Sequence, residues 1–185
     1  ARFVRTCLVD GTVGGGESSV SQLYLGPRRG LGGKTEPQRL WTHQLQLTIA
    51  DVVAEAHDTH HPVGTGLYYE DQKKEAQRRA KEFRTARVNK FLGWFETVLE
   101  RNPRGSEHLV GARLSYADLS LFQLVDGLQY AFPKASRRAL KKVPRVAALH
   151  ESVAQQRRVA AYLASERRIP FNHGDIFRRC PKLDA

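Results

Sequence analysis

The sequence predicts a mainly α-helical protein, a bundle of helices preceded by a short segment with β-structure. From Glu17 onward, apolar residues recur at the three- and four-residue spacing of amphipathic helices. The β-prone runs are confined to residues 1–16. A chain of 185 residues with 41% hydrophobic and 26% charged residues can bury one or two cores, and this composition excludes global disorder.

The first residues predict a β-hairpin that leads into a short helix. Residues 7–13 contain two β-prone runs around Asp10-Gly11, which is a turn signal because glycine tolerates positive φ. An amphipathic helix is expected from Glu17 to Leu25, ended by Gly26-Pro27. The Gly- and Arg-rich stretch 28–34 then predicts a linker.

Two long helices are expected after the linker. Thr35 can cap the first of them, with Gln38 at the third helical position, and His60-His61-Pro62 should end it. The second is expected over residues 70–101, ahead of Asn102-Pro103.

The sharpest local signal in the chain lies at residues 114–119. Ser115 can cap a helix whose third residue, Asp118, returns a hydrogen bond to the cap, while Leu114 and Leu119 can form a hydrophobic staple. The helix should continue to Phe132-Pro133. Because it is apolar nearly all round, we expect it to be the buried central helix.

The last part of the chain predicts two helices and an irregular tail. Ser136 can cap a short basic helix that ends at Lys142, and Pro144 can begin a helix that continues to Leu163. The tail, residues 169–185, is expected to pack back onto the bundle through Phe171, Ile176, Phe177 and Leu183.

In this order, the features resemble the glutathione transferase family. The resemblance is carried by Glu17-Ser18-Ser19-Val20 at a helix start, by the helical domain after a short linker, by the capping-box segment Gly111–Asp118, and by the Pro144 helix with its aromatic tail. It covers nearly the whole chain from Asp10 onward. It implies a thioredoxin-like N-terminal domain followed by an all-α helical bundle domain.

The resemblance divides the chain into residues 1–27, a remnant of the thioredoxin-like domain, residues 28–34, a linker, and residues 35–185, the all-helical glutathione transferase C-terminal domain. The first βαβα portion of the thioredoxin-like domain has no counterpart, and the family's cis-proline position falls on Thr6. That portion carries the family's catalytic Tyr, Ser or Cys. The catalytic residue is therefore unknown, and we expect a truncated α/β fragment.

Glu17 and Ser18 are the candidate glutathione-binding residues. At a helix N-terminus, backbone N–H groups and the Ser18 hydroxyl can hold a carboxylate, which the helix dipole also favours. Glu17 can accept the ligand's ammonium group. The resemblance assigns this chemistry to the γ-glutamyl end of glutathione. The alternative is an ordinary helix cap with a favourable first-turn charge.

The helix from Trp41 to His57 is, by the same resemblance, a candidate wall of the pocket for a hydrophobic electrophile, with Trp41 and His57 as weak candidates. His57, His60 and His61 have the spacing at which two side chains could face one metal ion. No fourth-ligand cluster accompanies them, so we expect no metal site and favour a helix C-terminus stabilised by histidine.

The charge of +11 raises the possibility of nucleic-acid binding. Eight Lys and Arg residues between 73 and 90 have Glu partners at helical spacing, and no nucleic-acid motif is present. We therefore expect a solvated face, and we regard nucleic acid as an unlikely partner. Two cysteines exclude a disulfide scaffold, Cys7 is expected in the core, and Cys180 is a weak redox candidate. No membrane span is predicted, and the expected location is cytoplasmic.

The resemblance implies conjugation of the glutathione thiolate to hydrophobic electrophiles, with glutathione as co-substrate and no other cofactor. We expect the intact protein to be a homodimer, and this chain to be weakly active or inactive. The alternative is a non-catalytic helical interaction module of the same architecture.

Overall fold

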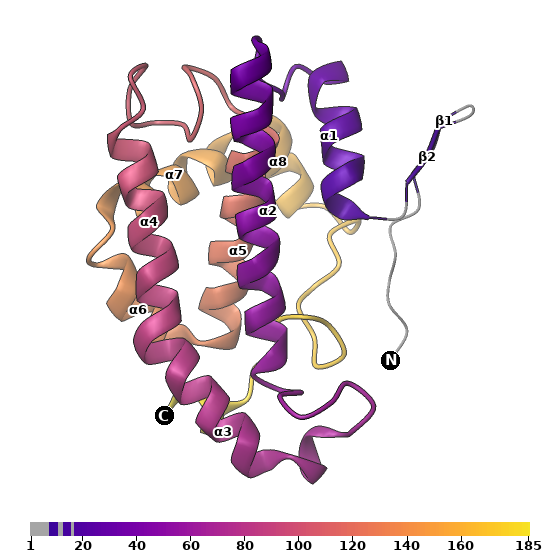
Figure 1. Ribbon diagram of the computed structural model, residues 1–185, viewed down its shortest axis with the longest axis vertical. Coiled ribbons are helices and arrows are strands. Elements are labelled where there is room, and N and C mark those ends of the chain that lie inside the picture. The colour runs from indigo at the N-terminus through magenta and orange to yellow at the C-terminus, as the bar shows by residue number, and fades with distance from the viewer. Residues whose placement is uncertain (1–7, 11–12, 16) are drawn as a thin grey trace.

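The computed structural model describes residues 8–10, 13–15 and 17–185, and shows a bundle of helices with a small hairpin beside it (Figure 1). The expectations for Thr6, Cys7, Gly11 and Thr12 lie outside the described residues. No helix in the described part of the chain combines the length and the apolar character needed to cross a membrane.

The hairpin and the first helix occur where the sequence predicts them. Strand β1 (Leu8–Asp10) pairs antiparallel with β2 (Val13–Gly15), in the register that sets Leu8 opposite Gly15 and Asp10 opposite Val13. Helix α1 (Ser18–Arg28) follows directly.

The expected end of α1 at Gly26-Pro27 is wrong, because the helix continues to Arg28. Gly26 serves a close contact between helices: a Cβ added there would overlap the ring of Tyr116, at the start of the central helix. The turn comes at Gly30, whose φ of 71° favours glycine. The linker is then tied to the bundle, since the Tyr116 amide donates to the Leu31 carbonyl at 2.9 Å.

Helix α2 (Glu36–Asp58) begins with the expected capping box, in which Thr35 and Gln38 exchange hydrogen bonds. The second long helix begins at Lys73, later than expected, because residues Tyr69–Asp71 form a 3₁₀ turn. It consists of α3 (Lys73–Glu82), a π-helical turn (Phe83–Arg87) and α4 (Val88–Glu100). The hydrophobic spacing of the sequence does not reveal that π turn.

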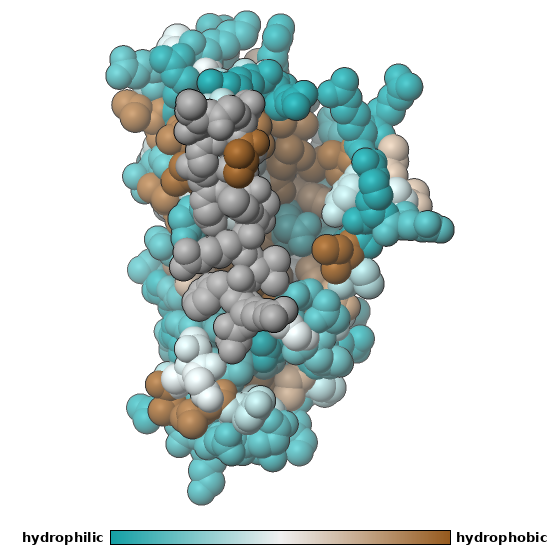
Figure 2. All heavy atoms as spheres, turned by 90° about the vertical axis from the view of Figure 1, so that its right-hand side faces the viewer, coloured by the Kyte–Doolittle hydropathy of each residue, from teal (hydrophilic) through white to brown (hydrophobic). Residues whose placement is uncertain are grey.

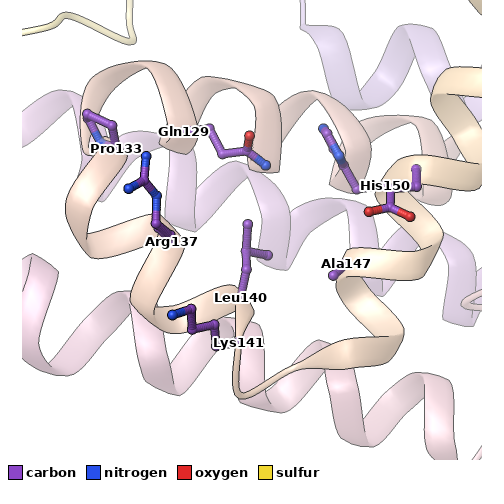
Figure 3. A pocket seen from close by; sticks show the side chains of 8 residues that line it. Gln129, Pro133, Arg137, Leu140, Lys141, Ala147 and His150 are labelled. Carbon is purple, nitrogen blue, oxygen red and sulfur yellow. The ribbon is translucent and has the colours of Figure 1, made fainter.

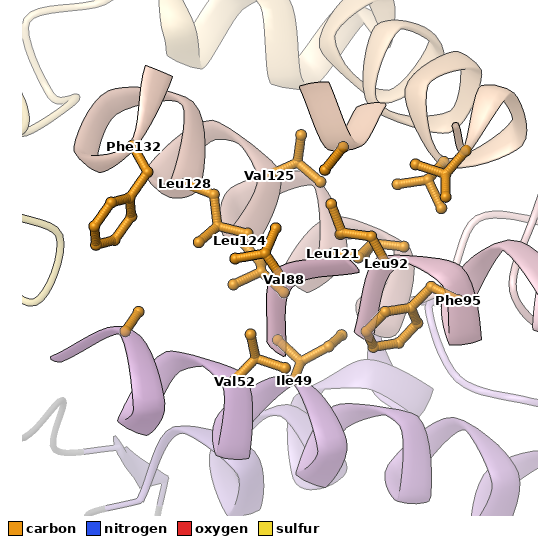
Figure 4. Close-up of a cluster of buried hydrophobic side chains, with 14 of the residues drawn as sticks. Ile49, Val52, Val88, Leu92, Phe95, Leu121, Leu124, Val125, Leu128 and Phe132 are labelled. Atoms are coloured by element: carbon orange, nitrogen blue, oxygen red, sulfur yellow. The ribbon is translucent and has the colours of Figure 1, made fainter. Parts of the chain in front are cut away.

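Helix α5 (Tyr116–Ala131) is the buried centre of the bundle, as its composition predicts. It lies behind α2 and α4 in Figure 1. Figure 4 shows its apolar side chains meeting those of the two long helices. The fully or almost fully buried members of this contact are Ile49, Val52, Val88, Leu92, Phe95, Leu121, Leu124, Val125 and Leu128.

Two shorter helices depend on caps from distant segments. Helix α6 (Pro133–Leu140) begins before Ser136, so the expected Ser136 cap is wrong. Its first amides instead donate to Asp184, from Lys134 at 2.7 Å and from Ala135 at 3.1 Å. Helix α7 (Pro144–Gln155) is capped in the same way by Glu96 on α4, which accepts from two of its first amides.

The helix expected from Pro144 to Leu163 is two helices, because Gln156 adopts a ψ of 126° between α7 and α8 (Arg157–Leu163). The tail beyond them packs back onto the bundle, as expected for three of its four apolar residues. Phe177 and Leu183 are buried, and Phe171 stacks on Tyr130 with ring centroids 4.9 Å apart. The expectation is wrong for Ile176, which is 46% exposed.

We predict that Gly127→Ala loosens the tail and lowers the free energy of unfolding by about 1–3 kcal/mol. A Cβ at Gly127 would overlap the ring of Phe177, so the ring must move away from α5. Urea unfolding followed by circular dichroism measures the effect. In a Phe177→Ala background, Gly127→Ala should not lower the free energy of unfolding, because the overlap is gone and alanine favours the helix. An equal decrease of the free energy of unfolding in both backgrounds would contradict this explanation.

Candidate functional site

Glu17 and Ser18 lie where β2 leads into α1, at the exposed N-terminus of the helix (Figure 1). Glu17 has the extended backbone of an N-cap, with φ of −104° and ψ of 134°, but its side chain makes no capping hydrogen bond. The carboxylate is thus not engaged in capping, and no side chain among the described residues caps the first amides of α1. A helix N-terminus left open in this way favours an anion.

The inner face of α1 is attached to the central helix. Gln22 donates from Nε2 to the Ser120 hydroxyl at 3.2 Å, while Ser21 is buried and its Oγ has no hydrogen-bond partner within the described residues. The Gln22 hydrogen bond and the close approach at Gly26 hold α1 against the central helix.

Trp41 and His57 are far apart on α2. They are sixteen positions apart in the sequence, which is about 24 Å along a helix. Trp41 is 41% exposed and packs edge-on against Trp94, with ring centroids 6.2 Å apart. His57 lies in the last turn of α2, next to His61. One small pocket in this chain cannot include both side chains, and their place in an electrophile pocket stays a prediction.

The histidines at the end of α2 form a polar cluster with the tail. His60 donates from Nε2 to the Arg178 carbonyl at 3.1 Å, and His61 accepts from the Arg178 guanidinium at 2.6 Å. Burial, followed by the charge of Arg178, lowers the pKa of His60 to about 4. Sequence reasoning found the histidines and missed Arg178, more than 100 residues away.

Cys180 is part of the same cluster. Its thiol donates to the Tyr69 hydroxyl at 3.4 Å, and burial raises the pKa of Tyr69 to about 12. In the described ranges, the structure contains no group of three or more His, Cys, Asp or Glu side chains suited to a metal ion. These contacts join the tail to the end of α2.

Two pockets of 490 Å³ each lie away from these residues. Figure 3 shows the first, between α5, α6 and α7, with Arg137 at one side and His150 at the other. The second lies where α1 ends, α2 begins and the loop before α5 passes. Neither is lined by Glu17, Ser18, Trp41 or His57.

The face that carries the hairpin exposes hydrophobic side chains at several separate places among hydrophilic ones (Figure 2). On α1, Val20 is 51% and Leu23 is 41% exposed, and on α2 Leu40 and Leu47 are exposed. Helices of a soluble bundle more often turn such residues inward.

Solved structures to which this chain is similar include glutathione S-transferases and a prostaglandin synthase. The chain is similar to the Pi-class glutathione S-transferase of Onchocerca volvulus, at 19% identity and a TM-score of 0.67, with 85% of this chain and 68% of that chain covered. It is similar to the glutathione S-transferase Blo t 8, at 19% identity and a TM-score of 0.70, with 86% and 67% covered. Prostaglandin synthase D of Nilaparvata lugens gives 16% identity and a TM-score of 0.70, with 89% and 74% covered.

At these identities the structural similarity shows the fold. No curated protein sequence matches the chain. The family model described as the C-terminal domain of glutathione S-transferase matches residues 57–166, which is more than half of the chain. The chain therefore belongs to the glutathione S-transferase family.

Proposed function

We propose that the protein acts on glutathione, with conjugation of its thiolate to hydrophobic electrophiles as the reaction. The family membership supports the class of reaction. The observation that supports a glutathione site within this chain is the start of α1, where Glu17 and Ser18 are exposed and no side chain caps the helix.

In this proposal the open N-terminus of α1 binds the γ-glutamyl end of glutathione. The first amides and the Ser18 hydroxyl donate hydrogen bonds to the α-carboxylate, which the helix dipole stabilises further. Glu17 accepts from the α-ammonium. Glutamate is not among the residues that ordinarily cap a helix, and the Glu17 side chain makes no capping hydrogen bond, so its carboxylate is available to the ligand.

The thiolate must be stabilised by a donor close to the sulfur before it attacks the electrophile. We assign no residue of this chain to that role. We accordingly propose that the 185-residue chain alone conjugates weakly or not at all, and that the whole protein is a cytoplasmic homodimer. A rapid reaction of the isolated chain with glutathione and a chromogenic aryl halide would contradict the first of these proposals.

We predict that Glu17→Gln and Ser18→Ala each weaken glutathione binding about tenfold, because each removes a hydrogen bond to a charged group of the ligand. Isothermal titration calorimetry measures the dissociation constants.

Ser19→Ala is the matched control, since Ser19 is the next serine in the same turn and has no assigned contact with glutathione. It should leave the affinity unchanged. Equal losses for Ser18→Ala and Ser19→Ala would point to a change in helix stability and would refute the assignment.

A further inference from the structure

A cleft of 490 Å³ opens at the end of α1 that lies opposite Glu17 and Ser18. We call it the linker cleft. It is formed by the end of α1, the linker, the start of α2 and the loop before α5. Most of the residues that line it are of two kinds, cations and small or apolar groups: Lys34, Arg39, Arg104 and Arg113, and Pro27, Gly30, Gly32, Gly33, Val110, Gly111, Ala112 and Leu114. Gln38, Thr42 and Ser115 complete the lining.

The charge of the linker cleft has one sign. Four cationic side chains line it and no carboxylate does, among the residues that the structure describes. The pocket of Figure 3, in contrast, includes Glu151 beside its two cations. The linker cleft therefore has the electrostatic character of an anion site.

Four arginines in the described part of the chain form ion pairs with carboxylates, namely Arg79, Arg87, Arg145 and Arg168. Arg87 pairs with Glu55 at 2.6 Å, and Arg168 pairs with Asp126 at 2.5 Å. In the described part of the chain, none of the four cleft cations forms an ion pair. The Arg39 guanidinium donates a hydrogen bond to the Lys34 carbonyl at 3.2 Å. Their charges are available to a ligand.

The walls of the linker cleft are held in place by hydrogen bonds. Gln38 accepts from the Lys34 amide at 2.9 Å, which fixes the linker against α2. Asn102 donates to the carbonyls of His108 and Gly111, at 2.7 and 2.8 Å, which fixes the loop before α5. The pocket therefore exists before a ligand arrives, and a preformed pocket lowers the entropic cost of binding.

Glycine backbone forms much of the wall. Gly111 has a φ of 67°, and a Cβ at Gly33 would lie 2.5 Å from the Cβ of Gln38. A side chain is thus disfavoured at both positions, and the main chain is left open to the cleft. The volume falls within the range of sites for small organic ligands.

We propose that the linker cleft binds a phosphate-bearing organic anion of about nucleotide size. The guanidinium groups of Arg39, on α2, and of Arg113, in the loop before α5, hold the phosphates together with Lys34 and Arg104. Pro27, Val110 and Leu114 contact the organic part. This site is separate from the proposed glutathione site, because α1, with 11 residues, places about 16 Å between them.

Calorimetric titration with adenosine diphosphate and with pyrophosphate tests the proposal on the full chain. The double variant Arg39→Ala/Arg113→Ala should bind both probes at least tenfold more weakly than the unsubstituted chain. The control, Arg137→Ala/Lys141→Ala, removes the same charge from the pocket of Figure 3 and should change the affinity less than twofold. Circular dichroism confirms that each variant is folded.

Three results would overturn the proposal. The first is no saturable binding of either probe by the unsubstituted chain. The second is an equal loss in both double variants, which indicates attraction by net charge alone. The third is binding of oligonucleotides with an affinity that rises with strand length while adenosine diphosphate fails to compete, which indicates an extended surface. Tighter binding of adenosine diphosphate than of pyrophosphate would support contacts with the organic part, and the reverse order would refute them.

Discussion

Asp118→Ala is expected to lower the free energy of unfolding by about 3–5 kcal/mol, which is about 10 °C in the melting temperature of a chain of this length. Asp118 is fully buried, and its carboxylate accepts from the Leu109 amide at 2.7 Å, the Ser115 amide at 2.6 Å and the Ser115 hydroxyl at 2.6 Å. Burial raises the pKa of Asp118, and these three hydrogen bonds oppose that shift. Removing the carboxylate leaves three buried donors without an acceptor.

Thermal and urea unfolding followed by circular dichroism check this result. Ser115→Ala provides the comparison. It removes the cap of the Asp118 amide and the hydroxyl's hydrogen bond to the carboxylate, but it leaves the two amide hydrogen bonds to that carboxylate, and it should lower the free energy of unfolding by about 1–2 kcal/mol. If Asp118→Ala cost no more than Ser115→Ala, the carboxylate would not be the centre of this junction between the loop and the central helix.

Acid is expected to weaken the fold through His60. The pKa of His60 in the folded chain is about 4, below its ordinary value of 6.5, because burial disfavours the charged ring and Arg178 repels it. The unfolded chain therefore binds this proton at a higher pH than the folded chain does. The stabilisation is complete above pH 6.5 and is lost as the pH falls toward 4, by up to about 3 kcal/mol.

Urea unfolding at a series of pH values between 7.5 and 4.5 measures this loss. His60→Gln should have a flatter pH dependence, since glutamine carries no titrating ring. His173→Gln, which changes an exposed histidine, should keep the slope of the unsubstituted chain. A slope that survives in His60→Gln would assign the acid sensitivity to other groups.

The parts of the fold that the sequence predicts correctly depend on neighbouring residues. The capping boxes at Thr35 and at Ser115 each join residues three positions apart, so their pattern is visible in the sequence. The caps that Asp184 gives to α6 and Glu96 gives to α7 connect residues about 50 positions apart. No local pattern reports such pairs, and the start of α6 was mispredicted for this reason.

Gly26 shows a second limit of prediction from sequence. Its place before proline predicts a helix end, whereas in the structure it lets α1 approach Tyr116 closely. A glycine that breaks a helix and a glycine that admits a neighbouring ring have the same appearance in the sequence. The three-dimensional contact decides between them.

In the candidate sites too, the sequence indicates pairs of neighbouring residues but not the contacts between distant ones. Glu17 and Ser18 are adjacent, so the sequence suggests them as a pair, but the absence of a cap hydrogen bond is visible only in the structure. The linker cleft unites Lys34 and Arg39 with Arg104 and Arg113, which lie more than 60 residues later. The sequence shows these cations merely as part of a net charge of +11.

The most direct test of the glutathione site compares two ligands in two proteins. Glutathione and an analogue without the α-amino group of its γ-glutamyl residue are titrated into the unsubstituted chain and into Glu17→Gln. If Glu17 accepts from the ammonium, the unsubstituted chain should bind the analogue about tenfold more weakly than glutathione, and the variant should bind both alike. The same preference for glutathione in both proteins would contradict a glutathione site at the start of α1.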